Sequence, residues 1–454
     1  MTSPIRQSVA PLYLFLCIVL GGSAQGIWAN MVLQLLGVAI LVLAAASPST
    51  EGLTSTGRHL LLLAFGAVAL IALQMLPLPP SLWMQLGGRQ IIVDGNATLG
   101  LGAPWLPLSL APYRTFDALL GLIPPLALFC AIASLGAYRR SWLVAALVSG
   151  TIAGIVLGAL QVTAAGDAAT SWYPYAQSSF GVATGFFANS NHMATLLVAT
   201  IPFLAALVRS AQGFNRQRSL MVMAVTAAAA LLLFVGILLN RSLAGYGLAP
   251  PVLAASALIL FLKRGSASHL AAAAAALLAL GAAVLLATTS IRGGTFGNDA
   301  EISVESRQDM LETTTEALRD YFPWGSGLGT FRSIYQLYED PAEVTSTYVS
   351  HAHNDYVELA LETGLPGILL LLLFLSWWGR ASWRAWSDAD LNAYARAATI
   401  ASAAILVHSL VDFPLRTATI AAVFAMCLAL LVERPPLSRR TGSDWRAARH
   451  VVIK

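Results

Sequence analysis

Charge is scarce in this chain. Only 11% of its 454 residues are charged, whereas 57% are hydrophobic, and the mean hydropathy is +0.71. So few polar residues cannot cover the surface of a water-soluble domain of this size, which excludes that class. Cysteine is also rare, and all three cysteines lie inside apolar runs, which argues against a disulfide framework or a cysteine-based metal site.

Long apolar runs, by contrast, recur along the whole chain. A run of about 20 apolar residues is long enough to cross a bilayer as a helix. The sequence therefore predicts an all-α, polytopic integral membrane protein with about twelve transmembrane helices. The runs lie near 10–27, 30–47, 59–77, 117–136, 141–163, 191–208, 219–239, 246–262, 268–288, 355–378, 396–411 and 417–433.

Basic residues indicate how these helices are oriented. If the N-terminus is cytoplasmic, most of the 26 Lys and Arg residues fall in inner loops or in the C-terminal tail. Cytoplasmic loops carry such an excess, so both termini are predicted to be cytoplasmic. The net charge of +4 then reflects these loops and does not indicate a nucleic-acid partner.

The loops divide the chain into four parts. We assign the first nine helices to 1–288, a large periplasmic loop to 289–354, the last three helices to 355–433 and a basic cytoplasmic tail to 434–454. Within the large loop, helical spacing over 306–321 precedes a Gly-rich turn at 324–329 and a second short helix at 331–338. This pattern predicts a helical periplasmic subdomain.

The segment HAHNDYVELALETGLPG at 351–367 gathers polar chemistry at the edge of an apolar run. As a helix it places Asp355, Glu358 and Glu362 on one face. Ionisable groups so close to lipid are costly unless they face protein, water or a partner. A functional role is therefore the first hypothesis for Glu358 and Glu362.

The apolar continuation of this segment is short. The 14 residues from Leu365 to Trp378 would extend only about 21 Å as a helix, less than a hydrocarbon core of roughly 30 Å. The spanning helix is therefore expected to begin near Asn354, or to dip and break at Gly364, Pro366 and Gly367.

Several arginines lie on the predicted outer side, against the charge rule. Arg241 occupies a very short outer connection, where a guanidinium suits a lipid-linked phosphate or diphosphate. The alternative is that Arg241 reaches lipid headgroups or pairs with an acid such as Glu358. His408, Asp412 and Arg416 repeat the pattern at another outer turn, where a structural polar network bracing two helices is the alternative.

Two histidines are candidates for proton transfer. His353 adjoins Asn354 at the expected helix start and can be held rigidly, whereas His351 is in looser sequence. An imidazole is the usual general base for a sugar hydroxyl. The alternatives are a histidine without chemistry, or a metal-binding pair with Asp355, for which no third ligand has a fitting spacing.

Together these residues resemble the O-antigen ligase and polymerase superfamily of bacterial inner-membrane glycosyltransferases. The resemblance covers nearly the whole chain and is carried by the order and spacing of several motifs. The matching segments are GFFANSNHMATLL at 185–197, RSLAGYG from Arg241, Arg307 with PWGSGLGTF at 323–331, the segment at 351–367, and HSLVDFP at 408–414.

The resemblance implies an enzyme that moves a glycan from undecaprenyl diphosphate to an acceptor hydroxyl of lipid A-core or another glycan. Transfer would occur at the periplasmic face of the inner membrane, with inversion and without a metal or other cofactor. By the match of positions, His353 would be the general base, and Arg241 and Arg307 would hold the diphosphate. Supporting positions would be Asn189, Asn191, Asn354, Glu358, Glu362, Asp412 and Arg416.

Other functions remain open at this stage. Arg241 is followed by Ser-Leu-Ala where an Arg-Gly continuation is more common in the family, which leaves the shape of that loop open. A polymerase of lipid-linked repeat units or a protein O-oligosaccharyltransferase would share the same donor and base. A secondary transporter is the alternative of another class, but no paired internal repeat is visible.

Overall fold

The computed structural model describes residues 4–47, 53–164, 170–261, 298–342, 344, 349–387 and 392–433. The predicted span at 268–288 and the predicted tail at 434–454 lie outside these residues. The described chain is mainly helical, as expected, with one two-stranded sheet.

Eight helical segments among the described residues are long and apolar enough to cross a membrane. They are α2 (Ile27–Ala46), α3 (Ser55–Gln74), α6 with α7 (Pro112–Gly121 and Ile123–Ala133), α8 (Arg140–Thr163), α9 (Ser190–Ala211), α10 (Arg216–Asn240), α11 (Leu243–Phe261) and α15 (Asp355–Ser387). Two shorter apolar helices, α1 (Pro4–Leu20) and α17 (Ala418–Leu431), and the 16-residue helix α16 (Ala393–His408) also lie among the described residues. The membrane class is thereby supported, and the expected count of about twelve spans is not confirmed.

Polar residues at the helix starts explain several of these boundaries. Thr54, Asn215, Asn392 and Thr417 each accept a hydrogen bond from a backbone N–H in the first turn of α3, α10, α16 and α17. Such caps satisfy donors that the helix itself leaves unpaired. Two boundaries differ clearly from the predicted runs: α1 ends at Leu20 and not near residue 27, and α15 ends at Ser387 and not near residue 378.

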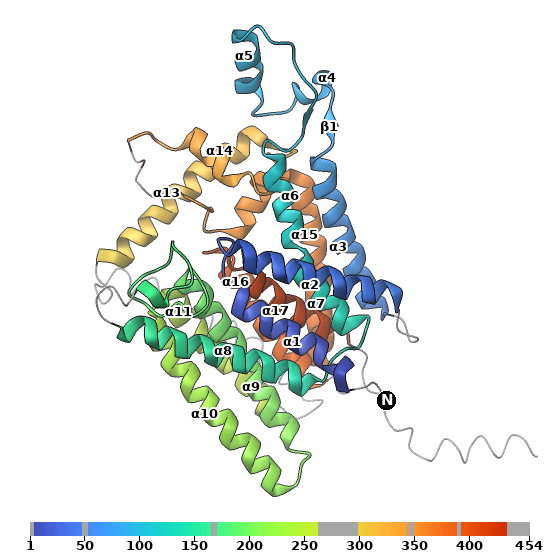
Figure 1. Cartoon of the computed structure of the whole chain (residues 1–454), viewed down its shortest axis with the longest axis vertical. Coiled ribbons are helices and arrows are strands. Elements are labelled where there is room, and N and C mark those ends of the chain that lie inside the picture. The colour runs from blue at the N-terminus through green and yellow to red at the C-terminus, as the bar shows by residue number, and fades with distance from the viewer. Residues whose placement is uncertain are drawn as a thin grey trace, which may run out of the picture.

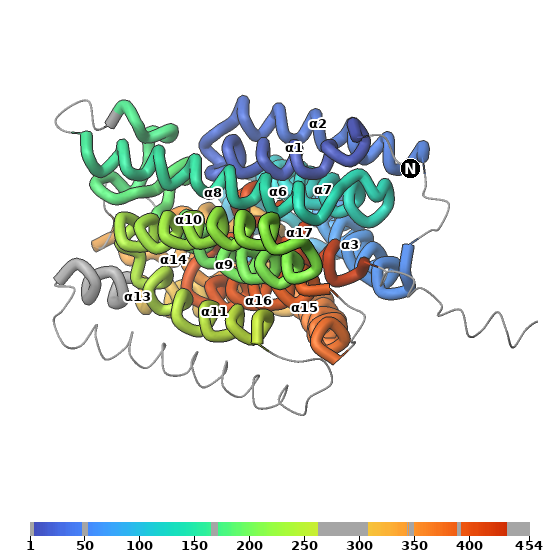
Figure 2. Tube along the Cα trace, turned by 90° about the horizontal axis from the view of Figure 1, so that it is seen from below, coloured from blue at the N-terminus to red at the C-terminus, as the bar shows by residue number. Residues whose placement is uncertain are grey.

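Helix α9 occupies the centre of the bundle and is buried along most of its length (Figures 1 and 2). It packs against α8, α10, α11 and α16, while α17 packs against α7, α1 and α16. Small residues permit close helix contact, as expected inside a membrane. Gly150 of α8, for example, lies directly against Ile18 of α1, and Gly236 of α10 lies against Ile155 of α8.

The two ends of the bundle hold different polar groups. At one end, Glu433 pairs with Arg140 at 2.8 Å and accepts a hydrogen bond from Asn392 at 3.2 Å. These residues come from three regions that the charge pattern assigns to the same side. Helix α16 separates them from His408, and its 16 residues extend about 24 Å.

Two small structures extend from the other end. Strands β1 (Pro77–Leu78) and β2 (Leu106–Pro107) pair antiparallel at the base of a projection that carries α4 (Pro80–Trp83) and α5 (Gln90–Thr98), at the top of Figure 1. Beside it lie α13 (Asn298–Tyr321) and α14 (Phe331–Tyr338), which pack on the first turns of α15. Both helices expected within the large loop are therefore present.

The Gly-rich turn after α13 docks into a break in α15. Gly364 has φ 59° and ψ −153° inside α15, so the helix is interrupted there, as the sequence suggested. Ser326 and Gly327 donate backbone hydrogen bonds to Leu361 and Glu362, and Leu365 donates to Pro323. The turn thus supplies backbone partners where the helix cannot, and it fixes the first two turns of α15.

We expect Gly325→Ala and Gly364→Ala each to destabilise the fold by about 1–3 kcal/mol, because both glycines have positive φ. A methyl group would also lie 2.6 Å from the Glu362 carbonyl oxygen or 2.1 Å from that of Pro323. Thermal unfolding of detergent-purified variants measures the effect.

Gly379→Ala is the matched control on α15, since nothing lies within 4 Å of its added methyl group. In a helix this change should leave the melting temperature unchanged or raise it. Equal melting temperatures for all three variants would show that the docked turn contributes nothing to stability.

Candidate functional site

The buried carboxylate of Asp412 is the centre of the site. It lies in the tight connection between α16 and the 3₁₀ turn η3 (Pro414–Arg416). Its Oδ2 accepts a hydrogen bond from Asn191 Nδ2 at 2.5 Å, and its Oδ1 accepts one from the Phe413 backbone N–H at 2.8 Å. Asp412 therefore ties the start of α9 to the end of α16.

Three cationic or ionisable groups approach the same carboxylate. His353 Nδ1 lies 3.5 Å and His192 Nε2 lies 3.6 Å from Oδ1, while Arg307 Nη2 lies 4.0 Å from Oδ2. These side chains come from the segment before α15, from α9 and from α13. The fold thus brings together residues more than 200 positions apart.

The charge of Asp412 follows from these neighbours. Burial by itself would raise the pKa of Asp412, but the hydrogen bonds and charges of His192 and His353 outweigh it and hold the pKa well below its ordinary value. The carboxylate is therefore an anion at neutral pH and acts only as a hydrogen-bond acceptor.

Local backbone geometry presents His353 at the start of α15. His353 has a left-handed backbone, with φ 49°. The next residue, Asn354, caps α15 by accepting from the backbone N–H groups of Tyr356 and Val357 at 3.0 and 3.1 Å. Asp355 then binds Ser409 at the end of α16 through its backbone N–H and its carboxylate, each at 2.9 Å. Three consecutive residues thus fix the imidazole beside Asp412.

The two predicted asparagines of α9 have separate roles. Asn189 caps α9 by accepting from the Asn191 backbone N–H at 2.8 Å. Asn191 bridges Asp412 and Ser242, whose hydroxyl donates to Asn191 Oδ1 at 2.8 Å. Asn191 therefore belongs to the Asp412 site directly, and Asn189 supports it through the helix start.

The backbone of Arg241 adjoins the site, because the residues on either side of it bond to the start of α9. It ends α10 with a left-handed φ of 55° and is solvent-exposed. Its neighbours hold it there: Asn240 donates to the carbonyl oxygens of Ala183 and Ser190, and Ser242 donates to Asn191. No ion pair of Arg241 occurs within the described residues, so its suggested pairing with Glu358 is not found.

A second cluster surrounds Arg416. Its guanidinium lies 3.2 Å from Glu358, 3.1 Å from Glu362 and 3.4 Å from Asp355. Burial would lower the pKa of Arg416, but the three carboxylates outweigh it and raise that pKa. Glu362 also accepts from the Phe331 backbone N–H at 3.1 Å, which links the cluster to α14. Arg416 therefore holds the first turns of α15 against η3.

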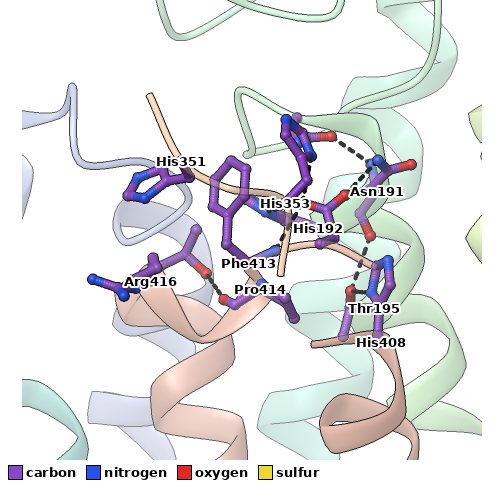
Figure 3. Close-up of polar contacts among 12 residues, drawn as sticks. Asn191, His192, Thr195, His351, His353, His408, Phe413, Pro414 and Arg416 are labelled. Atoms are coloured by element: carbon purple, nitrogen blue, oxygen red, sulfur yellow. Dashed lines mark hydrogen bonds and ion pairs between the residues drawn. The ribbon is translucent and has the colours of Figure 1, made fainter. Parts of the chain in front are cut away.

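The expectation that His351 sits loosely was wrong. His351 Nδ1 lies 2.8 Å from Glu358 Oε1, and the other oxygen of Glu358 accepts from the Ala352 backbone N–H at 2.9 Å. The ring of Phe413 separates the two predicted histidines, with centroids 4.2 Å from His351 and 5.0 Å from His353 (Figure 3). Both histidines are thus paired with a buried carboxylate, on opposite sides of one aromatic ring.

Sequence reasoning missed His192. It lies 3% exposed in the first turn of α9, with its ring against Phe413 and Phe187. The available signal was the polar run Asn-Ser-Asn-His ahead of an apolar helix. Like residues 351–354, it places histidine and asparagine directly before an apolar run. His408, by contrast, hydrogen-bonds Thr195 through Nδ1 at 2.6 Å and braces α16 against α9, as its structural alternative proposed.

The structure therefore divides the predicted residues. His353, Arg307, Asn191 and Asp412 come together, and Glu358, Glu362 and Arg416 form the neighbouring cluster. Asn189, Asn354 and Arg241 adjoin the site through helix ends. Within the described residues, no group of three or more His, Cys, Asp or Glu side chains has the arrangement of a metal site.

We expect Asp412→Asn to lower the free energy of unfolding by about 3 kcal/mol, because an amide N–H would face other donors where the buried anion now accepts. The folded pKa of Asp412 lies below its ordinary 3.8, so its contribution is complete above that value and is lost as pH falls below it. The stability gap between wild type and variant should stay constant from pH 8 to pH 5 and narrow below pH 4. Thermal unfolding across this pH range measures it, and a gap that closes between pH 7 and pH 5 would contradict the assigned charge.

Comparison with known proteins gives one result. Residues 227–372 match the family model described as O-antigen ligase, and no curated protein matches the chain. The matched region runs from α10 through the first half of α15 and contains Arg241, Arg307, His351 and His353. The resemblance drawn from the motifs is thereby confirmed over this region, which is similar to the O-antigen ligase family.

Proposed function

We propose that the protein is an inverting glycosyltransferase that moves a glycan from undecaprenyl diphosphate to an acceptor hydroxyl, with lipid A-core as the acceptor. The observation that carries this proposal is the meeting of the His353 imidazole and the Arg307 guanidinium on one buried carboxylate, Asp412. A proton acceptor and a fixed positive charge are the two groups that such a transfer requires.

In the proposed reaction the acceptor hydroxyl oxygen attacks the anomeric carbon of the donor sugar. The bond from that carbon to the diphosphate oxygen breaks, and its electron pair leaves with the diphosphate. His353 Nε2 takes the proton of the hydroxyl, while Nδ1–H faces the Asp412 carboxylate. The anion fixes the tautomer of His353 and balances the imidazolium that forms.

Arg307 and Arg241 are the proposed ligands of the diphosphate. Arg307 touches Asp412 with one nitrogen only, and its side chain remains 31% exposed, so other N–H groups can bind phosphate oxygens. Arg241 is exposed beside the start of α9. Arg416 is held by three carboxylates, and we assign it no phosphate.

The Arg416 cluster has a supporting role in this proposal. Glu358 and Glu362 anchor α15 to η3 and to α14, so they fix the segment that carries His353. Asn354 caps α15 directly after His353, and Asn189 caps α9, whose first turn contains His192. Preorganised groups of this kind cost little reorganisation when charge develops.

Within the superfamily, the donor chemistry is compatible with three kinds of acceptor. A polymerase would use a second lipid-linked repeat unit, and a protein O-oligosaccharyltransferase would use a protein hydroxyl. A secondary transporter is less favoured, because the described ion pairs lie at the ends of the apolar helices or on α13, whereas transporters place such groups at the midplane. We place the site on the periplasmic side of the inner membrane.

Deletion of the gene should stop attachment of the glycan to lipid A-core and cause polymer linked to undecaprenyl diphosphate to accumulate. The reason is that synthesis of the donor continues when only the transfer step is missing. Mass analysis of the extracted lipid-linked glycans measures this. Accumulation of single repeat units would instead identify a polymerase, and an unchanged lipid-linked pool would contradict both.

In proteoliposomes given that lipid-linked glycan and lipid A-core, we expect His353→Ala to lower turnover about 10²- to 10⁴-fold, through loss of the general base. Arg241→Ala and Arg307→Ala should lower kcat/KM for the donor, because each removes a proposed phosphate ligand. Quantifying glycosylated lipid A-core over time gives both constants.

Arg319→Ala is the matched control. Arg319 lies on α13, the same helix as Arg307, and its side chain is exposed, whereas that of Arg307 is partly exposed. It removes the same charge without removing a proposed ligand, and its kinetics should equal those of wild type. Turnover at the wild-type level for both His353→Ala and Arg307→Ala would refute the proposed mechanism.

A further inference from the structure

Among the groups facing Asp412, His192 has no part in the proposed chemistry. It is 3% exposed and lies between the rings of Phe187 and Phe413, with centroid distances of 6.3 and 5.0 Å. His353, in contrast, has a side chain 23% exposed. Only His353 can meet a substrate, so any effect of His192 on the reaction must pass through Asp412.

The two imidazoles share one oxygen atom. His353 Nδ1 lies 3.5 Å and His192 Nε2 lies 3.6 Å from Asp412 Oδ1, and both distances exceed an ordinary hydrogen bond. Neither nitrogen atom has another hydrogen-bond partner within the described residues. A buried polar nitrogen is normally satisfied, so the shared oxygen is the partner that both nitrogen atoms face.

The charge of Asp412 assigns the protons of both rings. A carboxylate that only accepts requires an N–H on each nitrogen facing it. His192 is therefore protonated at Nε2, and His353 is protonated at Nδ1 with its Nε2 lone pair directed elsewhere. The second tautomer is the one that can remove a proton from a hydroxyl.

The two histidines also differ in how firmly they are held. His192 belongs to α9, the central buried helix, and its ring is enclosed by aromatic side chains. His353 precedes α15 in a left-handed backbone conformation. His192 thus gives the Asp412 carboxylate a fixed donor, and this orients Oδ1 toward His353.

We propose that His192 is a positioning residue of the transfer reaction: through its Nε2–H it orients the Asp412 carboxylate that in turn holds His353 in the productive tautomer. This inference rests on the glycosyltransferase function proposed above. A small loss of alignment at a general base is enough to cost up to about 10²-fold in rate.

Two substitutions separate this role from packing. In His192→Gln the new side-chain amide nitrogen superposes on the position of imidazole Nε2, whereas in His192→Asn the amide nitrogen superposes on that of Nδ1. Because Nε2 faces Asp412, His192→Gln should keep kcat within about threefold of wild type, and His192→Asn should lower it about 10- to 100-fold. The donor KM should stay within about twofold in both, since neither change touches the proposed phosphate ligands.

A double-mutant cycle with Asp412→Asn tests whether the effect of His192 on kcat passes through Asp412. If His192 acts through Asp412, the His192→Asn/Asp412→Asn double variant should be no slower than Asp412→Asn alone. Thr200→Val, buried two turns further along α9, is the matched control and should keep wild-type kcat. All are measured in the same proteoliposome assay with the lipid-linked glycan and lipid A-core.

The outcomes are distinct. Equal losses in His192→Gln and His192→Asn, no loss in either, or fully additive effects with Asp412→Asn would overturn the positioning role. His353→Ala would still lower turnover about 10²- to 10⁴-fold in that case, so the proposed function would stand. Transfer that survives in His353→Ala would instead refute the function, and the positioning role with it.

Discussion

The hydrogen-bonded burial of one carboxylate determines the rest of this site. An isolated buried anion is strongly unfavourable, so Asp412 requires donors from every direction. Asn191, His192 and His353 supply them from α9 and from the start of α15, and the Phe413 backbone adds another. Because each donor lies at a helix end, the helices must meet at this end of the bundle for the charge to be tolerated.

The two polar clusters have opposite charge arrangements, and this separates their roles. Around Asp412, one anion is surrounded by two imidazoles and a partly exposed arginine. Around Arg416, one cation is surrounded by three carboxylates. In the first cluster Arg307 and His353 remain partly exposed. In the second, the three carboxylates neutralise the positive charge of Arg416. The ring of Phe413 lies between the two clusters. It therefore separates them, although Asp412 and Arg416 are only four positions apart in the chain.

Local patterns predicted the helices well, because apolar runs and caps are encoded within a few residues. The short helix α14 followed directly from such patterns, and a break near Gly364 was one of the two alternatives that they left. The end of α1 did not, since close approach of the segment at Phe186 to Gly22 decides it, and that contact is invisible in the sequence. His192 was missed for the same reason: its partner lies 220 positions further along the chain, and nothing in the local pattern of either residue names the other.

The docked break in α15 also divides that helix into two segments with different constraints. Beyond Gly364 the helix continues to Ser387, which gives 23 residues from Leu365 (387 − 365 + 1), or about 34 Å. That length matches a hydrocarbon layer, although its last third carries Arg380 and Arg384. Before the break, Glu358 and Glu362 are held by Arg416 and by the docked turn, so their position does not depend on where the longer segment meets lipid.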